Sequence, residues 1–284
     1  MSDLYGFDAY SPREIARRVE EVGVAKARMP LLPLTMLGVL AGGFIGLGAL
    51  SYTLVTSDAT LGFAAQRLLG GVAFSLGLIL VVVAGAELFT GNNLIAMAWA
   101  EGKVTSAEVL RNWIVVCSAN FAGAAGLAVL VVLSGHLGTD GGAVATQAVK
   151  IAAAKAALPA AEAFFRGVLC NILVCMAVWM AFAGRSVVDK VIAIVFPISA
   201  FVAAGFEHSI ANMYFFPVAM LQLAHVPSAI PGADLVDTAH MLRNFAFVIA
   251  GNIVGGSVLI ALVYHLIYRR GGTAAQGKAG PPHG

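Results

Sequence analysis

Charged residues are scarce in this sequence: 15 Asp and Glu and 17 Lys and Arg make up only 11% of its 284 residues. In an ordinary soluble chain about a quarter of the residues are charged, because the folded surface must be solvated. Hydrophobic residues make up 60% of the chain, and the mean hydropathy is +0.88. The composition therefore excludes a soluble globular domain and predicts an all-α integral membrane protein of packed spans.

Other features are also missing. The net charge is only +2 and no basic run is interleaved with aromatic residues, which argues against a nucleic acid partner. Cys117, Cys170 and Cys175 lie in apolar stretches without a CxxC pair, so we expect packing residues and neither a disulfide nor a metal site. The charged N-terminus has no apolar segment typical of a cleavable signal peptide. No nucleotide-binding or hydrolase motif is present, so no cofactor is expected.

Residues 11–28 predict an amphipathic helix ahead of the first hydrophobic stretch. Ser11 can cap this helix, and Glu14 completes a capping box. Ile15, Val19 and Val22 then share one face. The pattern is compatible with a helix on the bilayer surface and with a gating element at a pore mouth.

Six hydrophobic stretches are long enough to span a bilayer: 31–55, 69–98, 110–134, 160–183, 190–222 and 243–268. The expected organisation is a cytoplasmic N-terminal helix (1–29), a six-helix transmembrane channel domain (30–270) and a disordered cytoplasmic tail (271–284). With six spans, both termini lie on one side of the membrane. That side carries twelve Lys and Arg residues against four in the opposite loops, which predicts cytoplasmic termini.

Two of these stretches contain polar interruptions in matching places. The second contains Glu87-Leu-Phe-Thr90-Gly-Asn-Asn93, and the fifth contains Gly205-Phe-Glu207-His208-Ser209-Ile-Ala-Asn212. The third and sixth stretches share an Asn-x-x-Gly pattern at Asn120 and Asn252. We therefore expect an inverted three-plus-three repeat in which helices 2 and 5 are broken.

His208 is the residue in these breaks that most strongly indicates function. Ionisable groups at mid-membrane are costly and usually line a cavity. A hydrogen-bonded core histidine is the alternative, but the surrounding polar cluster and the matching break favour a pore-lining role. Histidine changes charge near neutral pH, so it can pass a proton to a weak-acid anion or stabilise that anion.

Glu87 and Glu207 occupy parallel places just before the two breaks, and we expect both to be structural. Each can accept hydrogen bonds from backbone N–H groups that the break frees. Further donors and acceptors at the same depth are Thr90, Asn92, Asn93, Ser209 and Asn212. The half-helix N-termini at such breaks would point positive dipole ends at an anion.

Other candidates are less distinctive. Phe74, Leu78 and Phe201 are compatible with core packing and with the hydrophobic constrictions that exclude hydrated ions. Lys155 precedes the fourth stretch and is either a solvated loop residue or an anion-attracting residue of a vestibule. Because neither a second catalytic cluster nor metal ligands accompany Glu207 and His208, a membrane-embedded enzyme is the less favoured alternative.

The sequence resembles the formate/nitrite transporter family. The resemblance rests on Gly85-Ala-Glu-Leu-Phe-Thr-Gly-Asn92 and Gly205-Phe-Glu-His-Ser-Ile-Ala-Asn-Met213, supported by Cys170-Asn-Ile-Leu-Val-Cys-Met-Ala-Val-Trp-Met180 and Gly184-Arg-Ser-Val-Val-Asp-Lys190. It covers residues 7 to 270. It implies an aquaporin-like fold of six spans in a homopentamer, with a pore in each protomer.

The resemblance also implies roles for single residues. His208 would be the central pore histidine with Thr90 near it, and Lys155 would be the vestibule lysine. Phe74 and Leu78 would form one constriction. Further roles would fall to Phe201 in a second constriction and to the pore or histidine partners Asn171 and Asn212.

The segments Phe7-Asp8, Val22-Gly-Val-Ala-Lys26 and Gly184–Lys190 are most similar to the formate channels. Ala154–Pro159, Phe164–Asn171 and Gly91 are closer to the nitrite branch. We therefore expect a transporter of formate, or of its conjugate acid, in a bacterial inner membrane, with His208 coupling or buffering a proton. Nitrite or hydrosulfide is the alternative substrate.

Overall fold

The computed structural model describes residues 9–226 and 229–270. All regular elements in this part of the chain are helical, and six helices are long and apolar enough to cross a membrane. The six are α2 (Leu31–Ser57), α3 continued by η2 (Phe63–Gly85), α6 (Ser106–Leu133), α8 (Ala160–Ala181), α9 (Val187–Ala204) and α11 with its continuation (Thr238–Tyr268). The expectation of an all-α multi-pass membrane protein is thereby confirmed. The segments Phe7-Asp8 and 271–284 lie outside the described residues.

The second and fifth of the expected hydrophobic stretches each contain two helical segments. Helix α3 passes through the π-helical η2 (Leu80–Gly85), and after Ala86–Leu88 the chain continues as α4 (Phe89–Asn92), η3 (Asn93–Ile95) and α5 (Ala96–Ala100). Helix α9 (Val187–Ala204) and α10 (Ser209–His225) are separated by the four residues 205–208. Gly85 and Gly205 leave these helices with φ of +82° and +75°, a left-handed conformation that glycine adopts without a Cβ clash.

Glycines bring two pairs of spans together. A Cβ on Gly42 of α2 would meet the Asn120 carbonyl of α6, and a Cβ on Gly251 of α11 would meet the Phe164 carbonyl of α8. Small residues of this kind let backbones approach closely where lipid offers no hydrophobic driving force between helices. The pairs α2–α6 and α8–α11 therefore pack backbone against backbone.

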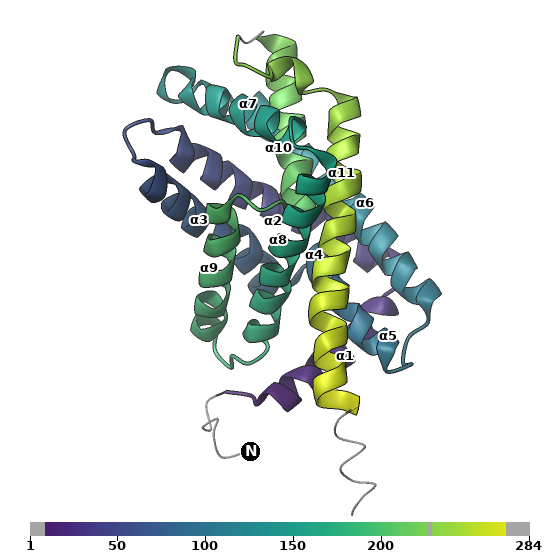
Figure 1. Cartoon of the computed structure of the whole chain (residues 1–284). Helices are drawn as coiled ribbons and strands as arrows, with labels where there is room; N and C mark the ends of the chain where they lie inside the picture. Colours follow the sequence, from purple (N-terminus) through teal and green to yellow (C-terminus); the bar gives the residue numbers. More distant parts are fainter. Residues whose placement is uncertain (1–8, 227–228, 271–284) are drawn as a thin grey trace, which may run out of the picture.

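Two helices outside the spans lie at opposite ends of the bundle (Figure 1): α1 (Pro12–Ala27) and α7 (Ala143–Ala156). Helix α1 has the expected capping box of Ser11 and Glu14. Hydrogen bonds from the backbone and side chain of Ser11 lower the pKa of the exposed Glu14 carboxyl. Helix α7 was not expected from the sequence. Because α1 also contacts η8 (Leu266–Arg270), the two ends of the described chain meet at the α1 end.

Candidate transport site

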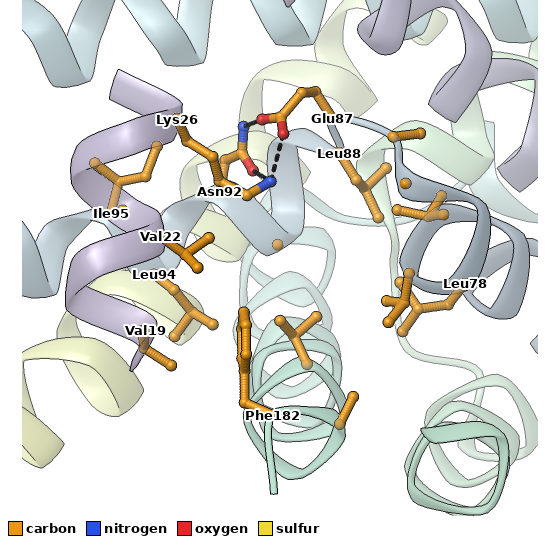
Figure 2. A pocket seen from close by; sticks show the side chains of 18 of the residues that line it. Val19, Val22, Lys26, Leu78, Glu87, Leu88, Asn92, Leu94, Ile95 and Phe182 are labelled. Carbon is orange, nitrogen blue, oxygen red and sulfur yellow. Dashed lines mark hydrogen bonds and ion pairs between the residues drawn. The ribbon is translucent and has the colours of Figure 1, made fainter. Parts of the chain in front are cut away.

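Two cavities of similar size enter the bundle. The first, about 380 Å³, is at the α1 end and the second, about 370 Å³, is at the α7 end. Figure 2 shows the first, with Val19 and Val22 of α1 on one side and Leu78 on the other. Phe74, one turn earlier on α3, lines the second cavity. Phe74 and Leu78, both almost fully buried, therefore lie where the two cavities approach each other.

His208 lies in the lining of the second cavity, at the break between α9 and α10. Its Nδ1 accepts a hydrogen bond from the Ala211 backbone N–H at 3.1 Å. In the neutral ring the proton is then on Nε2, which lies 3.0 Å from Thr90 Oγ1 and donates to it. Thr90 comes from the other break, on α4, so this hydrogen bond connects the two interrupted helices.

Aromatic rings surround this histidine. The Phe201 ring stacks on the imidazole with centroids 5.9 Å apart, and Phe74 meets it edge-on at 6.5 Å. The two phenyl rings contact each other at 5.8 Å. All three side chains are at most 3% exposed, so the imidazole is a buried polar group packed against apolar rings.

Glu87, at the first break, is held by side chains. Its carboxylate accepts from Lys26 Nζ at 2.6 Å and from Asn92 Nδ2 at 2.7 Å, as Figure 2 shows. The Asn92 amide also donates to Asn112 Oδ1, and Asn112 in turn donates to the Lys26 carbonyl. The network fixes the end of α1 against the break.

The second break repeats this network. Glu207 accepts from Lys155 Nζ at 2.8 Å and from Asn212 Nδ2 at 2.7 Å. Asn212 also donates to Asn244 Oδ1, and Asn244 donates to the Lys155 carbonyl. Lys155 is thus the counterpart of Lys26, in the last turn of α7. The interpretation of Lys155 as a solvated loop residue is wrong, because it lies in a helix and its side chain is only 14% exposed and paired with Glu207.

The backbone groups at the breaks are satisfied by two asparagines. Asn120 accepts from the Phe89 N–H and donates to the carbonyls of Gly38 and Glu87 at 2.7 and 2.9 Å. Asn252 does the same for the Ser209 N–H and for the carbonyls of Gly167 and Glu207. We expected the two glutamates to accept from the freed N–H groups; that expectation is wrong, because their carboxylates face lysine and asparagine side chains.

The remaining candidates lie around this centre. Asn171 donates to the Thr90 carbonyl at 3.2 Å, to Asn93 Oδ1 and to the Asn252 carbonyl. It therefore holds the backbone of Thr90 in place. Its side chain lines neither cavity, and the same holds for Asn212. In the described part of the chain neither amide bonds the His208 ring. Ser209 contributes its backbone N–H to the break, and its hydroxyl is buried.

Sequence reasoning missed Lys26, Asn112 and Asn244 as parts of the site. A signal for the first was present: Lys26-Ala-Arg-Met-Pro30 and Lys155-Ala-Ala-Leu-Pro159 share a Lys-Ala-x-x-Pro pattern directly before a span. Because Glu87 and Glu207 also occupy matching places in the two halves, the pattern indicates a lysine partner for each glutamate.

A bundle of six spans with a cavity at each end, and a histidine between apolar residues where the cavities approach, defines a membrane channel or transporter. Comparison with known proteins gives the family: the sequence model of the formate/nitrite transporter family matches residues 13–266, and the chain belongs to this family. The resemblance seen in the sequence is confirmed. No cluster of metal-ligating side chains occurs among the described residues.

The relatives are channels and transporters. The chain is 38% identical over 274 residues to the formate channel FocA of Escherichia coli K12, covering 93% of this chain and 96% of that protein. It is 36% identical to FocA of Haemophilus influenzae, covering 89% and 93%. A solved pentameric formate channel with formate bound superimposes with a TM-score of 0.78 at 39% identity, covering 84% and 97%. Family and structural neighbours thus support transport and not enzymatic activity.

Proposed function

We propose that this protein carries formate, as the anion or as formic acid, across the membrane. The observation that carries the proposal is the Thr90–His208 hydrogen bond between two cavities, each with a lysine–glutamate pair at its helix break. The formate channels among its relatives support the choice of solute.

The proposed route begins in the second cavity. The Lys155 ammonium attracts the anion, although Glu207 neutralises part of its charge. Phe201 and Phe74, and then Leu78, form the apolar constrictions. Because moving a bare charge through such a constriction costs about 3 kcal/mol or more, the solute crosses as the neutral acid.

His208 assists this crossing as a hydrogen-bond donor and as a group that can exchange a proton. Its Nε2–H and the Thr90 hydroxyl form a polar pair within the apolar zone, and the pair hydrogen-bonds the solute and couples or buffers a proton. Asn171 positions Thr90 through its carbonyl, and Asn212 positions Glu207. For His208 and Thr90 these are the roles that the sequence resemblance implies, whereas it implies pore or histidine partners at Asn171 and Asn212.

The wider arrangement follows the same reasoning. We propose a homopentamer in a bacterial inner membrane, with cytoplasmic termini and the α7 end outside. A pentameric structural relative and the distribution of Lys and Arg support this. The matching hydrogen bonds of the two breaks support an inverted repeat. Helix α1, whose Val19 and Val22 line the first cavity, is then a gate at the cytoplasmic mouth.

The test is uptake into proteoliposomes at several pH values, comparing formate, nitrite, hydrosulfide and the neutral solute glycerol. We expect saturable formate flux that rises as the external pH falls. His208→Phe should change this pH dependence while size-exclusion chromatography shows an unchanged assembly. Glycerol flux without formate flux would refute the proposal, and collapse of the assembly in His208→Phe would favour a core histidine. If the flux of nitrite or of hydrosulfide exceeds that of formate, that anion replaces formate as the proposed substrate.

A further inference from the structure

The two cavities differ in charge. Four cations line the second cavity against the single carboxylate of Glu207: Arg67, Lys150, Lys155 and Arg166. The first cavity has two cations, Lys26 and Lys190, against the carboxylate of Glu87. Since each cavity uses one lysine to pair its glutamate, the positive excess of the second resides in its other three cations.

These three cations are not equally available to a ligand. Arg166 is occupied by Glu162, whose Oε2 lies 2.7 Å from its Nη2. Lys150 is exposed at the end of a flexible side chain. Arg67 is half-buried and, within the described residues, forms no ion pair. Its contacts are a long hydrogen bond of 3.4 Å to the Tyr52 hydroxyl and the Phe63 ring at 5.5 Å. Most of its N–H donors are therefore free for a ligand.

The position of Arg67 places these donors on the route to His208. Arg67 and Phe74 line the same cavity from α3, and their separation of seven residues is about two helical turns. A Cβ on Gly205 would lie 3.6 Å from both terminal nitrogens of Arg67, so the guanidinium faces the break before Glu207 and His208. A solute entering from the α7 end meets Arg67 before the constriction.

We propose that Arg67 forms a docking subsite in the second cavity for a small planar anion with two oxygens, such as formate. The guanidinium fork binds a carboxylate through two parallel N–H···O bonds, which an ammonium cannot reproduce. Docking at Arg67 raises the local concentration of the anion ahead of Lys155 and lowers KM, with little effect on the crossing itself. Hydrosulfide has one heavy atom and cannot accept two parallel bonds on separate atoms, as a carboxylate does. The substrate named here rests on the proposed function.

The test compares Arg67→Gln and Arg67→Lys with Lys150→Gln, which removes the same charge from an exposed position of the same cavity. Initial rates of formate uptake into proteoliposomes give KM and kcat for each variant. Loss of a two-bond charged contact predicts a rise in KM of about tenfold in Arg67→Gln, with kcat within about twofold. Arg67→Lys should be intermediate for formate and close to the wild type for hydrosulfide, while Lys150→Gln changes KM by less than about twofold.

Equal effects of Arg67→Gln and Lys150→Gln would overturn the subsite in favour of diffuse attraction, and an unchanged KM in Arg67→Gln would overturn it outright. Calorimetric titration of formate into the purified pentamers measures docking without flux. If the wild type binds formate through Arg67 but carries none, the proposed function fails and the subsite stands. If the wild type carries formate and Arg67→Gln binds it equally well, the subsite alone fails.

Discussion

Thr90 Oγ1 lies 3.0 Å from His208 Nε2, although the two residues are 118 positions apart in the chain. Each stands at the break of a different interrupted helix. Both side chains are buried, and the other ring nitrogen of His208 is already used by the Ala211 backbone. The hydroxyl of Thr90 is therefore the group that satisfies Nε2 in the absence of a solute.

Replacing Thr90 by valine tests this pairing, because valine has the shape of threonine without the hydroxyl. The variant leaves a buried N–H unsatisfied, at a cost of about 1–3 kcal/mol. We expect the pH dependence of formate uptake to change in Thr90→Val, as we also expect for His208→Phe, while Thr90→Ser keeps the wild-type profile. An unaltered profile in Thr90→Val would show that His208 acts without this partner.

Asn120 offers a test of how the breaks are stabilised. Asn120→Leu fills the space but leaves the Phe89 N–H and the Glu87 carbonyl unpaired, each worth about 1–3 kcal/mol when buried, and removes a second bond from the helical Gly38 carbonyl. We expect the free energy of unfolding to fall by about 3 kcal/mol or more, measured by tryptophan fluorescence during thermal denaturation in detergent. The control is Leu130→Ala on the same helix, whose side chain is 65% exposed. Similar losses in both variants would mean that the break does not depend on Asn120.

The spans were predictable because a bilayer requires long apolar helices, and few other segments satisfy that demand. Helix α7 was missed since it has only 14 residues and carries Gln147, Lys150 and Lys155 among alanines. Alanine, lysine and glutamine all favour a helix, so the local sequence was sufficient to predict this element. Its position against α10 could not be predicted, because only the fold shows that contact.

The polar residues at the centre of the candidate site could be predicted from the sequence, but their ion pairs with the surrounding cations were missed. Glu207 and His208 are conspicuous because polar groups in apolar helices are costly. Lys26 is 61 positions from Glu87 in the chain and lies in a helix outside the spans, so only the repeated Lys-Ala-x-x-Pro pattern could have indicated it. The sequence does not distinguish Arg67 from other cations, because only the fold shows that its guanidinium faces Gly205.

The packing of α2 against α6 predicts opposite effects for two glycines of α6. A Cβ on Gly123 would overlap the Val39 carbonyl of α2, whereas a Cβ on Gly126 would find no atom within 4 Å. Gly123→Ala should lower the free energy of unfolding by about 1–3 kcal/mol, because the backbones must separate. Gly126→Ala should be neutral or raise it by up to about 1 kcal/mol through helix propensity. Thermal denaturation of the two variants measures the difference, and equal destabilisation would contradict the close approach at Gly123.

The Lys155–Glu207 pair predicts strong coupling between its members. Lys155→Met leaves the Glu207 carboxylate, 4% exposed, without its cation, which should lower the free energy of unfolding by about 3–5 kcal/mol. The double variant Lys155→Met/Glu207→Gln removes the unpaired charge and keeps an acceptor for Asn212, so it should regain most of this loss. The matched control is the exposed pair of Arg166 and Glu162, where Glu162→Gln should cost less than about 1 kcal/mol. Thermal denaturation gives the loss of unfolding free energy in each variant. If the loss in the double variant equals the sum of the losses in the two single variants, Lys155 and Glu207 do not stabilise each other.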